Sequence, residues 1–209
     1  MTVYLLAHGS VDPRHAADVA LIGKRLGAAL DRDVRACYLD LCPPSLREVA
    51  ELPGVVVPLL FSPGYHARVD VAEAVAQARV PLAVAAPPLL TAGADWGRDL
   101  LAETRLSNPG RAVVFVTAGT RDAEVLAMWG ETAGALGIPV VHASGLGPRL
   151  ADAPLAAGAE VVALPLLVAR GSFSDQIGGH AAAAGMPVAE VAGTSEALVA
   201  ELARVVRAA

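Results

Sequence analysis

The chain has 209 residues, of which 55% are hydrophobic and 18% charged, and its formal net charge is −5. This composition excludes a disordered chain, and the scattered Lys and Arg residues give no electrostatic footprint for nucleic acid. Apolar runs stay shorter than the roughly 18 residues of a membrane span, and no positively charged signal region opens the chain, so we expect a cytoplasmic protein without a membrane partner.

The first half of the sequence alternates apolar runs with helical patterns. Buried strands are expected over residues 3–7, 34–39, 55–60 and 82–85. Helices are expected over residues 14–30, 45–51, 67–78 and 91–106, and the second begins with a capping-box spacing from Ser45 to Glu48. Strands that are apolar on both faces and alternate with helices predict an α/β fold with a parallel sheet covered on both sides.

After a turn at 108–110 the pattern restarts. Strands are expected over 112–116, 140–143, 161–168 and 187–191, and helices after residue 122 and over 195–206. Gly119-Thr120-Arg121-Asp122 stands where Gly9-Ser10-Val11-Asp12 stood in the first half. Internal similarity at a separation of about 110 residues predicts a duplicated, doubly wound α/β unit, with domains 1–109 and 110–209.

Two histidines and a carboxylate follow three strands of the first half. His8 ends the first apolar run, Asp40 the second, and His66 comes after the third and the turn Ser62-Pro63-Gly64. Because the carboxyl ends of parallel strands meet at one edge of a sheet, we expect these side chains to lie together. Neutral imidazoles with one carboxylate suit Fe, Co, Ni or Zn better than Mg or Ca, and histidines can also accept protons.

The second half serves as a control within the chain. Ala118 lies opposite His8, Phe173 opposite His66, and the strand opposite Asp40 ends without a carboxylate. The halves share turn and core residues, whereas only the first keeps the ionisable ones, which favours chemistry in domain 1–109. The remaining histidines are weaker candidates: we expect His15 to be solvated, and His142 and His180 belong to the other half.

Several classes of site are absent from the sequence. It holds no Walker A motif and no G-x-G-x-x-G after a strand, so no nucleotide or other organic cofactor is expected. No G-x-S-x-G elbow supports a hydrolase of that kind. Cys37 and Cys42 are the only cysteines, so an iron–sulfur cluster within one chain is excluded, and both are expected to be buried or half-buried thiols.

Two motifs together resemble the CbiX/SirB-type sirohydrochlorin chelatases, ATP-independent class II enzymes that insert a divalent metal into a tetrapyrrole. They are Leu6-Ala7-His8-Gly9-Ser10-x-Asp12-Pro13-Arg14 and Pro58-Leu59-Leu60-Phe61-x-x-Gly64-Tyr65-His66-x-x-x-Asp70. The resemblance covers nearly the whole chain, since longer members carry two chelatase-like halves. It implies that His8 and His66 bind the metal and serve deprotonation of the macrocycle. It also implies that Asp40 assists where the family has a glutamate, which is one methylene longer.

The resemblance implies an anionic tetrapyrrole, sirohydrochlorin, as the partner, with Fe²⁺, Co²⁺ or Ni²⁺ as the metal substrate. The macrocycle is expected in a cleft between the two lobes, where the planar guanidinium groups of Arg14 and Arg68 would pair with its carboxylates. The other residues expected to contact it are Ser10, Ser62, Pro63, Gly64 and Tyr65. The sequence leaves the oligomeric state open.

Two other functions compete with the chelatase. The first is a carrier that holds a metal or a tetrapyrrole without turnover. The second is a hydrolase such as a histidine phosphatase, which only the His-Gly pair after the first strand suggests. The arginine that usually precedes such a histidine is Ala7 here.

Overall fold

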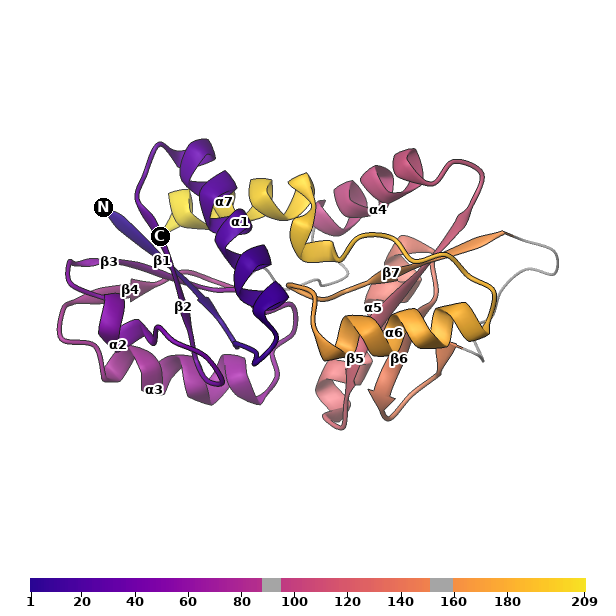
Figure 1. Cartoon of the computed structure of the whole chain (residues 1–209), viewed down its shortest axis with the longest axis horizontal. Helices are drawn as coiled ribbons and strands as arrows, with labels where there is room; N and C mark the ends of the chain where they lie inside the picture. Colours follow the sequence, from indigo (N-terminus) through magenta and orange to yellow (C-terminus); the bar gives the residue numbers. More distant parts are fainter. Residues whose placement is uncertain (88–94, 151–159) are drawn as a thin grey trace. The chain divides into compact units, whose positions relative to one another are not determined.

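The computed structural model describes residues 1–87, 95–150 and 160–209, which form two compact α/β units (Figure 1). Unit 1 comprises Met1–Leu89 and Leu198–Ala209, and unit 2 comprises Leu90–Ala197. The predicted fold class is confirmed, because each unit is built around its own parallel sheet with helices packed on it. No helix in the described part of the chain is long and apolar enough to cross a membrane.

The sheet of unit 1 has the strand order β2-β1-β3-β4, with all neighbours parallel. Its strands are β1 (Thr2–Ala7), β2 (Val34–Tyr38), β3 (Gly54–Pro58) and β4 (Leu82–Val84). Its helices are α1 (Pro13–Leu30), α2 (Leu46–Val49), a π-helical turn at His66–Asp70 and α3 (Val71–Ala76). The helices predicted from residues 14 and 45 begin within one residue of those positions, and the one predicted from residue 67 begins with the π-helical turn at His66. The predicted start of the fourth, residue 91, lies outside the described residues.

Side chains alternate between the two faces of this sheet, which explains why its strands are apolar throughout. Tyr4 and Leu6 of β1 belong to a buried cluster with Leu46 of α2 and Val71 of α3. On the opposite face, Leu5 approaches α1 at Gly23, where a side chain is missing and the helix can come close. Figure 1 shows α1 on one side of the strands and α2 and α3 on the other.

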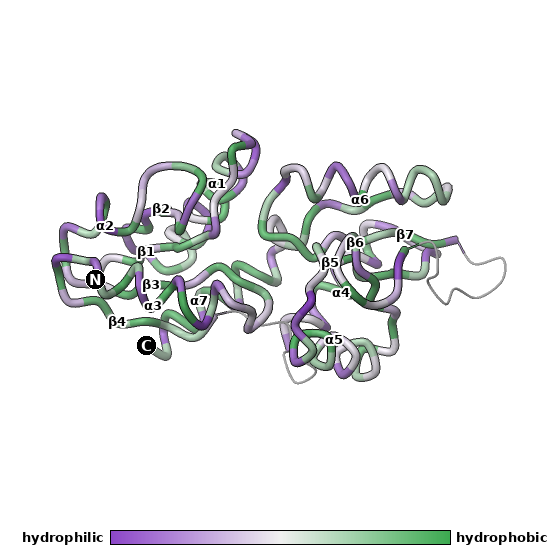
Figure 2. The backbone as a smooth tube through the Cα atoms, turned by 90° about the horizontal axis from the view of Figure 1, so that it is seen from below, coloured by the Kyte–Doolittle hydropathy of each residue, from purple (hydrophilic) through white to green (hydrophobic). Residues whose placement is uncertain are grey.

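Unit 2 repeats this plan with a three-stranded sheet of strand order β6-β5-β7, in which neighbouring strands are again parallel. Its strands are β5 (Ala112–Thr120), β6 (Val140–Gly145) and β7 (Val161–Pro165). Its helices are α4 (Asp95–Ser107), α5 (Ala123–Leu136), α6 (Ser172–Ala183), a 3₁₀ turn at Ala192–Thr194 and the start of α7 (Glu196–Ala208). Figure 2 shows α6 and α5 on opposite sides of these strands.

The strand predicted over 187–191 is wrong. Val188 forms only an isolated parallel bridge to Ala163, and the strand expected over 161–168 ends at Pro165. The N–H of Leu166 still donates to the carbonyl of Val116 at 2.8 Å, so β7 keeps its pairing with β5 past Pro165. Pairing with the segment around Val188 stops at one bridge, because Pro165 and Pro187 have no N–H to donate on either side of it.

The compact units do not follow the predicted division at residue 109. Helix α4, which follows β4 in the first repeat, belongs to unit 2, and the last turns of α7 belong to unit 1. Contacts support both assignments. The carboxylate of Glu103 on α4 accepts hydrogen bonds from the backbone N–H groups of Glu196 and Ala197 at 3.2 Å each, and Arg207 donates to the carbonyl of Ala29 on α1 at 3.1 Å.

The turn after the first strand of each unit has the same geometry. Gly9 and Gly119 both have φ of +100°, and a Cβ at either would overlap a backbone carbonyl oxygen, that of Asp40 or Ser144. In both units the next aspartate caps the following helix. These equivalent corners support the predicted duplication and align Ala118 with His8.

Candidate functional site

The corner after β1 fixes the position of His8. Asp12 caps α1 by accepting a hydrogen bond from the N–H of Arg14 at 2.9 Å, and Pro13 occupies the first helical position, where no N–H is needed. The positive φ of Gly9 turns the chain sharply, and the carbonyl of His8 accepts a hydrogen bond from the N–H of Asp40 at 2.9 Å. His8 therefore lies at the carboxyl edge of the sheet, as predicted.

His66 begins the π-helical turn that leads into α3. Its Nδ1 lies 2.5 Å from the Oδ2 of Asp70, one helical turn further on, and the two side chains are 50% and 29% exposed. A carboxylate can only accept, so Nδ1 of His66 is the donor in this bond. The bond orients the ring and leaves Nε2 as the nitrogen with a free lone pair.

The two predicted histidines meet. Their ring centroids are 4.3 Å apart and the ring planes are inclined by 73°. Nδ1 of His8 lies 3.2 Å from the carbonyl oxygen of Gly9, which also can only accept, so His8 has the same tautomer as His66. Two neighbouring imidazoles thus each keep an Nε2 lone pair, which can bind a metal ion or take a proton.

A pocket of about 290 Å³ opens beside the histidines and belongs entirely to unit 1. His8, Asp40 and His66, the three residues predicted for catalysis, all line it. One carboxylate oxygen of Asp40 accepts a hydrogen bond from the N–H of Leu41 at 2.7 Å. The remaining lining residues are Tyr38, Leu39, Ser45, Leu46, Arg47, Asp70, Glu73, Ala74 and Gln77.

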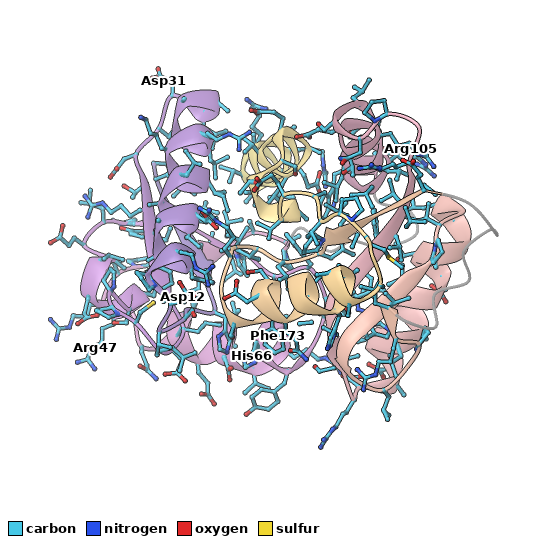
Figure 3. The ribbon with its side chains drawn as sticks, turned by 45° about the vertical axis from the view of Figure 1, so that its right-hand side comes forward. Asp12, Asp31, Arg47, His66, Arg105 and Phe173 are labelled. Carbon is cyan, nitrogen blue, oxygen red and sulfur yellow. The ribbon has the colours of Figure 1, made fainter. Side chains whose placement is uncertain are left out.

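The sequence analysis gave no role to the residues that α3 and α2 bring to the pocket. Asp70, Glu73 and Gln77 follow His66 at intervals of about one helical turn, so the helical spacing places them on the face of His66. That spacing was a usable signal. Arg47 of α2 lines the pocket as well, and its side chain points into solvent (Figure 3).

The residues expected to contact the macrocycle do not line this pocket. The guanidinium of Arg14 pairs with Asp12, with Nη2 2.6 Å from the nearer carboxylate oxygen. This pairing lowers the pKa of Asp12 to about 2. Arg68 donates from Nε to the carbonyl of Pro63 at 2.5 Å, and the hydroxyl of Ser10 accepts the N–H of Asp12 at 3.1 Å.

The remaining turn residues Ser62, Pro63 and Gly64 precede the π-helical turn and are partly exposed. The carbonyl of Gly64 accepts hydrogen bonds from the N–H groups of Ala67 and Arg68 at 3.1 and 3.2 Å, which anchors the turn to the helix. Tyr65 is exposed, and its ring meets that of His66 edge-on at 6.0 Å.

The expectation that His15 is solvated is wrong for one side of its ring, since the residue is half-buried. Its Nδ1 is buried and makes no hydrogen bond within the described residues, and its ring centroid lies 6.0 Å from that of Tyr38. Burial, followed by the proximity of His8, lowers the pKa of His15. In unit 2, His142 is buried and its Nδ1 lies 2.7 Å from the hydroxyl of Thr117, which gives it a structural role.

The thiols are as predicted. Cys37 is buried and Cys42 half-buried, and neither forms a disulfide. Burial raises the pKa of Cys37 to about 12, which keeps this thiol protonated and unreactive. Within residues 1–87, 95–150 and 160–209, no group of three or more His, Cys, Asp and Glu side chains could hold a metal ion, so the histidine pair has no third protein ligand there.

The α/β unit with two imidazoles at the carboxyl edge of its sheet has counterparts among known proteins. The CbiX family model matches residues 2–83, a range that contains His8, Asp40 and His66. The predicted resemblance to the CbiX/SirB-type chelatases is thus confirmed, and the sequence match lies in the first repeat. No curated protein sequence gives a significant match to the chain.

Solved structures share the fold over the whole chain. SirB from Bacillus subtilis with Fe³⁺ has a TM-score of 0.76 at 16% identity, covering 99% of this chain and 94% of that one. SirB from Bacillus subtilis subspecies spizizenii in complex with cobalt has a TM-score of 0.73 at 16% identity, with coverages of 99% and 93%. CbiX, described as the terminal enzyme of sirohaem biosynthesis in denitrifying bacteria, has a TM-score of 0.74 at 18% identity, with coverages of 100% and 99%. At these identities the likeness establishes the fold.

Proposed function

We propose that this protein is a cytoplasmic sirohydrochlorin chelatase, which inserts Fe²⁺, Co²⁺ or Ni²⁺ into the tetrapyrrole without ATP. One observation carries the proposal: the imidazoles of His8 and His66 lie 4.3 Å apart in the part of the chain that the CbiX family model matches. SirB of the same fold has been solved with Fe³⁺ and with cobalt, which supports a late first-row metal as the substrate here.

Metal insertion requires a metal-binding site and proton acceptors at the same place. Insertion of a divalent ion into the free tetrapyrrole forms four bonds from nitrogen to metal and releases two protons from the pyrrole N–H groups. Nε2 of His8 and of His66 would hold the ion, and each lone pair can accept a pyrrole proton once the ion has left it. The site has no third protein ligand within the described residues, so the ion keeps positions open for the incoming nitrogens.

Asp40 and Asp70 are proposed to assist in different ways. Asp70 fixes the tautomer of His66 through the 2.5 Å bond to Nδ1. Asp40 lines the same pocket as both histidines, and we assign it an auxiliary electrostatic role, since one of its oxygens already accepts the N–H of Leu41.

The test is metal insertion into sirohydrochlorin, followed by the change in its visible spectrum and corrected for spontaneous insertion. His8→Ala and His66→Ala should each lower the catalysed rate by more than about 100-fold, because loss of a mere supporting group already costs 10–100-fold. His180→Ala in unit 2 is the matched control and should keep the wild-type rate. Full activity of either site variant, with circular dichroism showing it folded, would reject the proposal.

The same assay separates the chelatase from the predicted carrier. With catalytic amounts of protein, a chelatase converts many equivalents of sirohydrochlorin, whereas a carrier gives at most one stoichiometric change. The open histidine pair favours transfer, because sites that retain a metal usually surround it with four protein ligands.

A further inference from the structure

Three large apolar side chains stand exposed on the loops that carry the site residues. Val11 is 85% exposed in the loop after β1, Leu41 is 52% exposed in the loop after β2, and Tyr65 is 65% exposed in the loop after β3. We call these three residues the apolar rim. Single exposed apolar side chains are common on protein surfaces, whereas several that gather around one site can mark a binding surface.

The three loops touch one another at the site. The loop after β2 bonds to the loop after β1 through the N–H of Asp40 and the carbonyl of His8, 2.9 Å apart. The loop after β3 reaches the same corner through the ring of His66, 4.3 Å from that of His8. Each member of the apolar rim therefore belongs to a loop that meets the histidine pair.

The backbone of Leu41 is the most informative feature. Its φ is +66°, and among the described residues the other positive values belong to glycines and to Asp31. Aspartate tolerates this left-handed region, whereas leucine rarely adopts it. The conformation is held locally, since the N–H of Leu41 donates to the carboxylate of Asp40 at 2.7 Å and the N–H of Cys42 to the carbonyl of Asp40 at 2.8 Å.

The second repeat shows which residue this backbone favours. The register of β1 with β2 and of β5 with β6 aligns Leu41 with Gly145, whose φ is +75°. Likewise, Arg121 stands in the place of Val11. The repeat without the histidines therefore uses glycine where the repeat with them holds an exposed leucine in an unfavourable conformation. Packing within unit 1 does not explain this choice.

We propose that the apolar rim of Val11, Leu41 and Tyr65 contacts the apolar face of the tetrapyrrole. The inference rests on the proposed chelatase function. An ion held by two imidazoles must enter the centre of a flat ring, so the ring has to lie face-on over the loops around the histidines. Exposed apolar side chains on the three loops that meet the histidine pair match a macrocycle that is apolar over its face and carries its carboxylates at the edge.

The decisive variant is Leu41→Gly, which removes the side chain and relieves the backbone at once. Its melting temperature should stay the same or rise. The Kd for metal-free sirohydrochlorin, measured by titrating its absorbance, should increase about tenfold, as expected for loss of one buried apolar side chain from a complex. The KM should rise in parallel while kcat changes less than about twofold, because contact with the ring face is made equally before and during insertion. Val11→Ser and Tyr65→Ser should raise the Kd in the same direction.

Leu52 provides a matched control, since it is also 52% exposed but precedes β3, at the opposite edge of the sheet. Leu52→Ala should leave the Kd for sirohydrochlorin unchanged, whereas Leu41→Ala should raise it.

Several results would overturn the inference. A lower melting temperature of Leu41→Gly would make Leu41 a packing residue. An unchanged Kd in Leu41→Gly would show that the apolar rim does not touch the ring, and if that variant instead abolished self-association in sedimentation, a second copy of the chain would be the occupant. If the wild type binds sirohydrochlorin without turnover, the chelatase proposal fails while the Kd series still decides on the apolar rim. Absence of any binding would reject both.

Discussion

Asp70 shows how much of a site can depend on a residue that touches neither substrate. The carbonyl of Gly9 and the carboxylate of Asp70 each accept from an Nδ1, so the two histidines present their Nε2 atoms in one tautomeric state. The acceptors differ in kind: a carboxylate binds an imidazole N–H more strongly than a carbonyl does. His66 is therefore held more firmly than its half-exposed position alone would allow.

We expect Asp70→Ala to lower the rate of metal insertion by about 10–100-fold, the usual cost of losing an outer-shell carboxylate. The loss should be smaller than that of His66→Ala, because Nε2 survives and only its orientation is released. Nitrogen-15 NMR of the ring should show His66 shifting from one tautomer to a mixture. Glu73→Gln changes another carboxylate of the pocket that bonds to neither histidine, and it should retain the rate. Equal losses in both variants would contradict a positioning role for Asp70.

The sequence allowed some of these residues to be predicted and not others. The sequence was sufficient to predict His8, Asp40 and His66 as site residues, because each follows an apolar strand and parallel strands bring their carboxyl ends to one edge of the sheet. Asp70 could have been predicted only from its helical spacing, which places it one turn after His66 and makes it a candidate hydrogen-bond partner of that ring. His15 was misjudged because its position in the first turn of α1 says nothing of Tyr38 on β2, whose ring lies 6.0 Å away on the side where Nδ1 of His15 is buried.

At the scale of elements, most strands and helices follow their local patterns, and the errors in the strands of unit 2 arise where proline interrupts them. Helix α6 was not predicted. Hydropathy predicts a strand through residue 168 and another from 187, but hydropathy does not count backbone donors. Pro165 and Pro187 lack one, so the fourth strand of unit 2 is reduced to the bridge at Val188. β3 also ends at a proline, Pro58, two residues before its predicted limit, although the N–H of Leu59 still donates to the carbonyl of Leu6 at 2.7 Å.

Alanine variants of Gly9 and Gly119, at the equivalent turns of the two units, can distinguish an effect on stability from an effect on metal insertion. Alanine at either position meets both the strain of φ +100° and a backbone carbonyl, so each variant should lose more than about 1 kcal/mol of stability. Gly9→Ala should also reduce metal insertion per folded molecule, because it pushes the strand end with His8 away from Asp40. Gly119→Ala should spare it.

The measurements are thermal unfolding and the insertion rate at a temperature where each variant is folded. The control for these two variants is Gly130→Ala within α5, where a Cβ would meet open space; it should be neutral or stabilising. If Gly119→Ala lowered the insertion rate as much as Gly9→Ala, the chemistry would not be confined to the corner of unit 1.

At the scale of the whole molecule, the sequence reveals the two repeats, but it does not reveal that α4 of the first repeat and the last turns of α7 of the second each belong to the other compact unit. An amphipathic pattern in α4 or α7 indicates that one face is buried, and it carries no information on which of two similar sheets covers that face. The repeats end near residue 109, whereas the compact units take α4 into unit 2 and the last turns of α7 into unit 1. Homologous halves can therefore depend on each other for a complete core.

Deletion of Leu198–Ala209 tests this dependence. The segment carries the buried side chains of Leu198, Leu202, Val205 and Val206, each contributing about 1.5–3 kcal/mol by burial. Because the segment belongs to unit 1, hydrogen exchange should show loss of protection in β1–β4 and α1, although they lie more than a hundred residues away in sequence. Truncation after Val206 removes only exposed residues and the bond from Arg207 to Ala29, and should leave protection unchanged. Intact protection of β1–β4 after the longer deletion, or earlier loss in β5–β7, would show that α7 does not complete the core around the histidine pair.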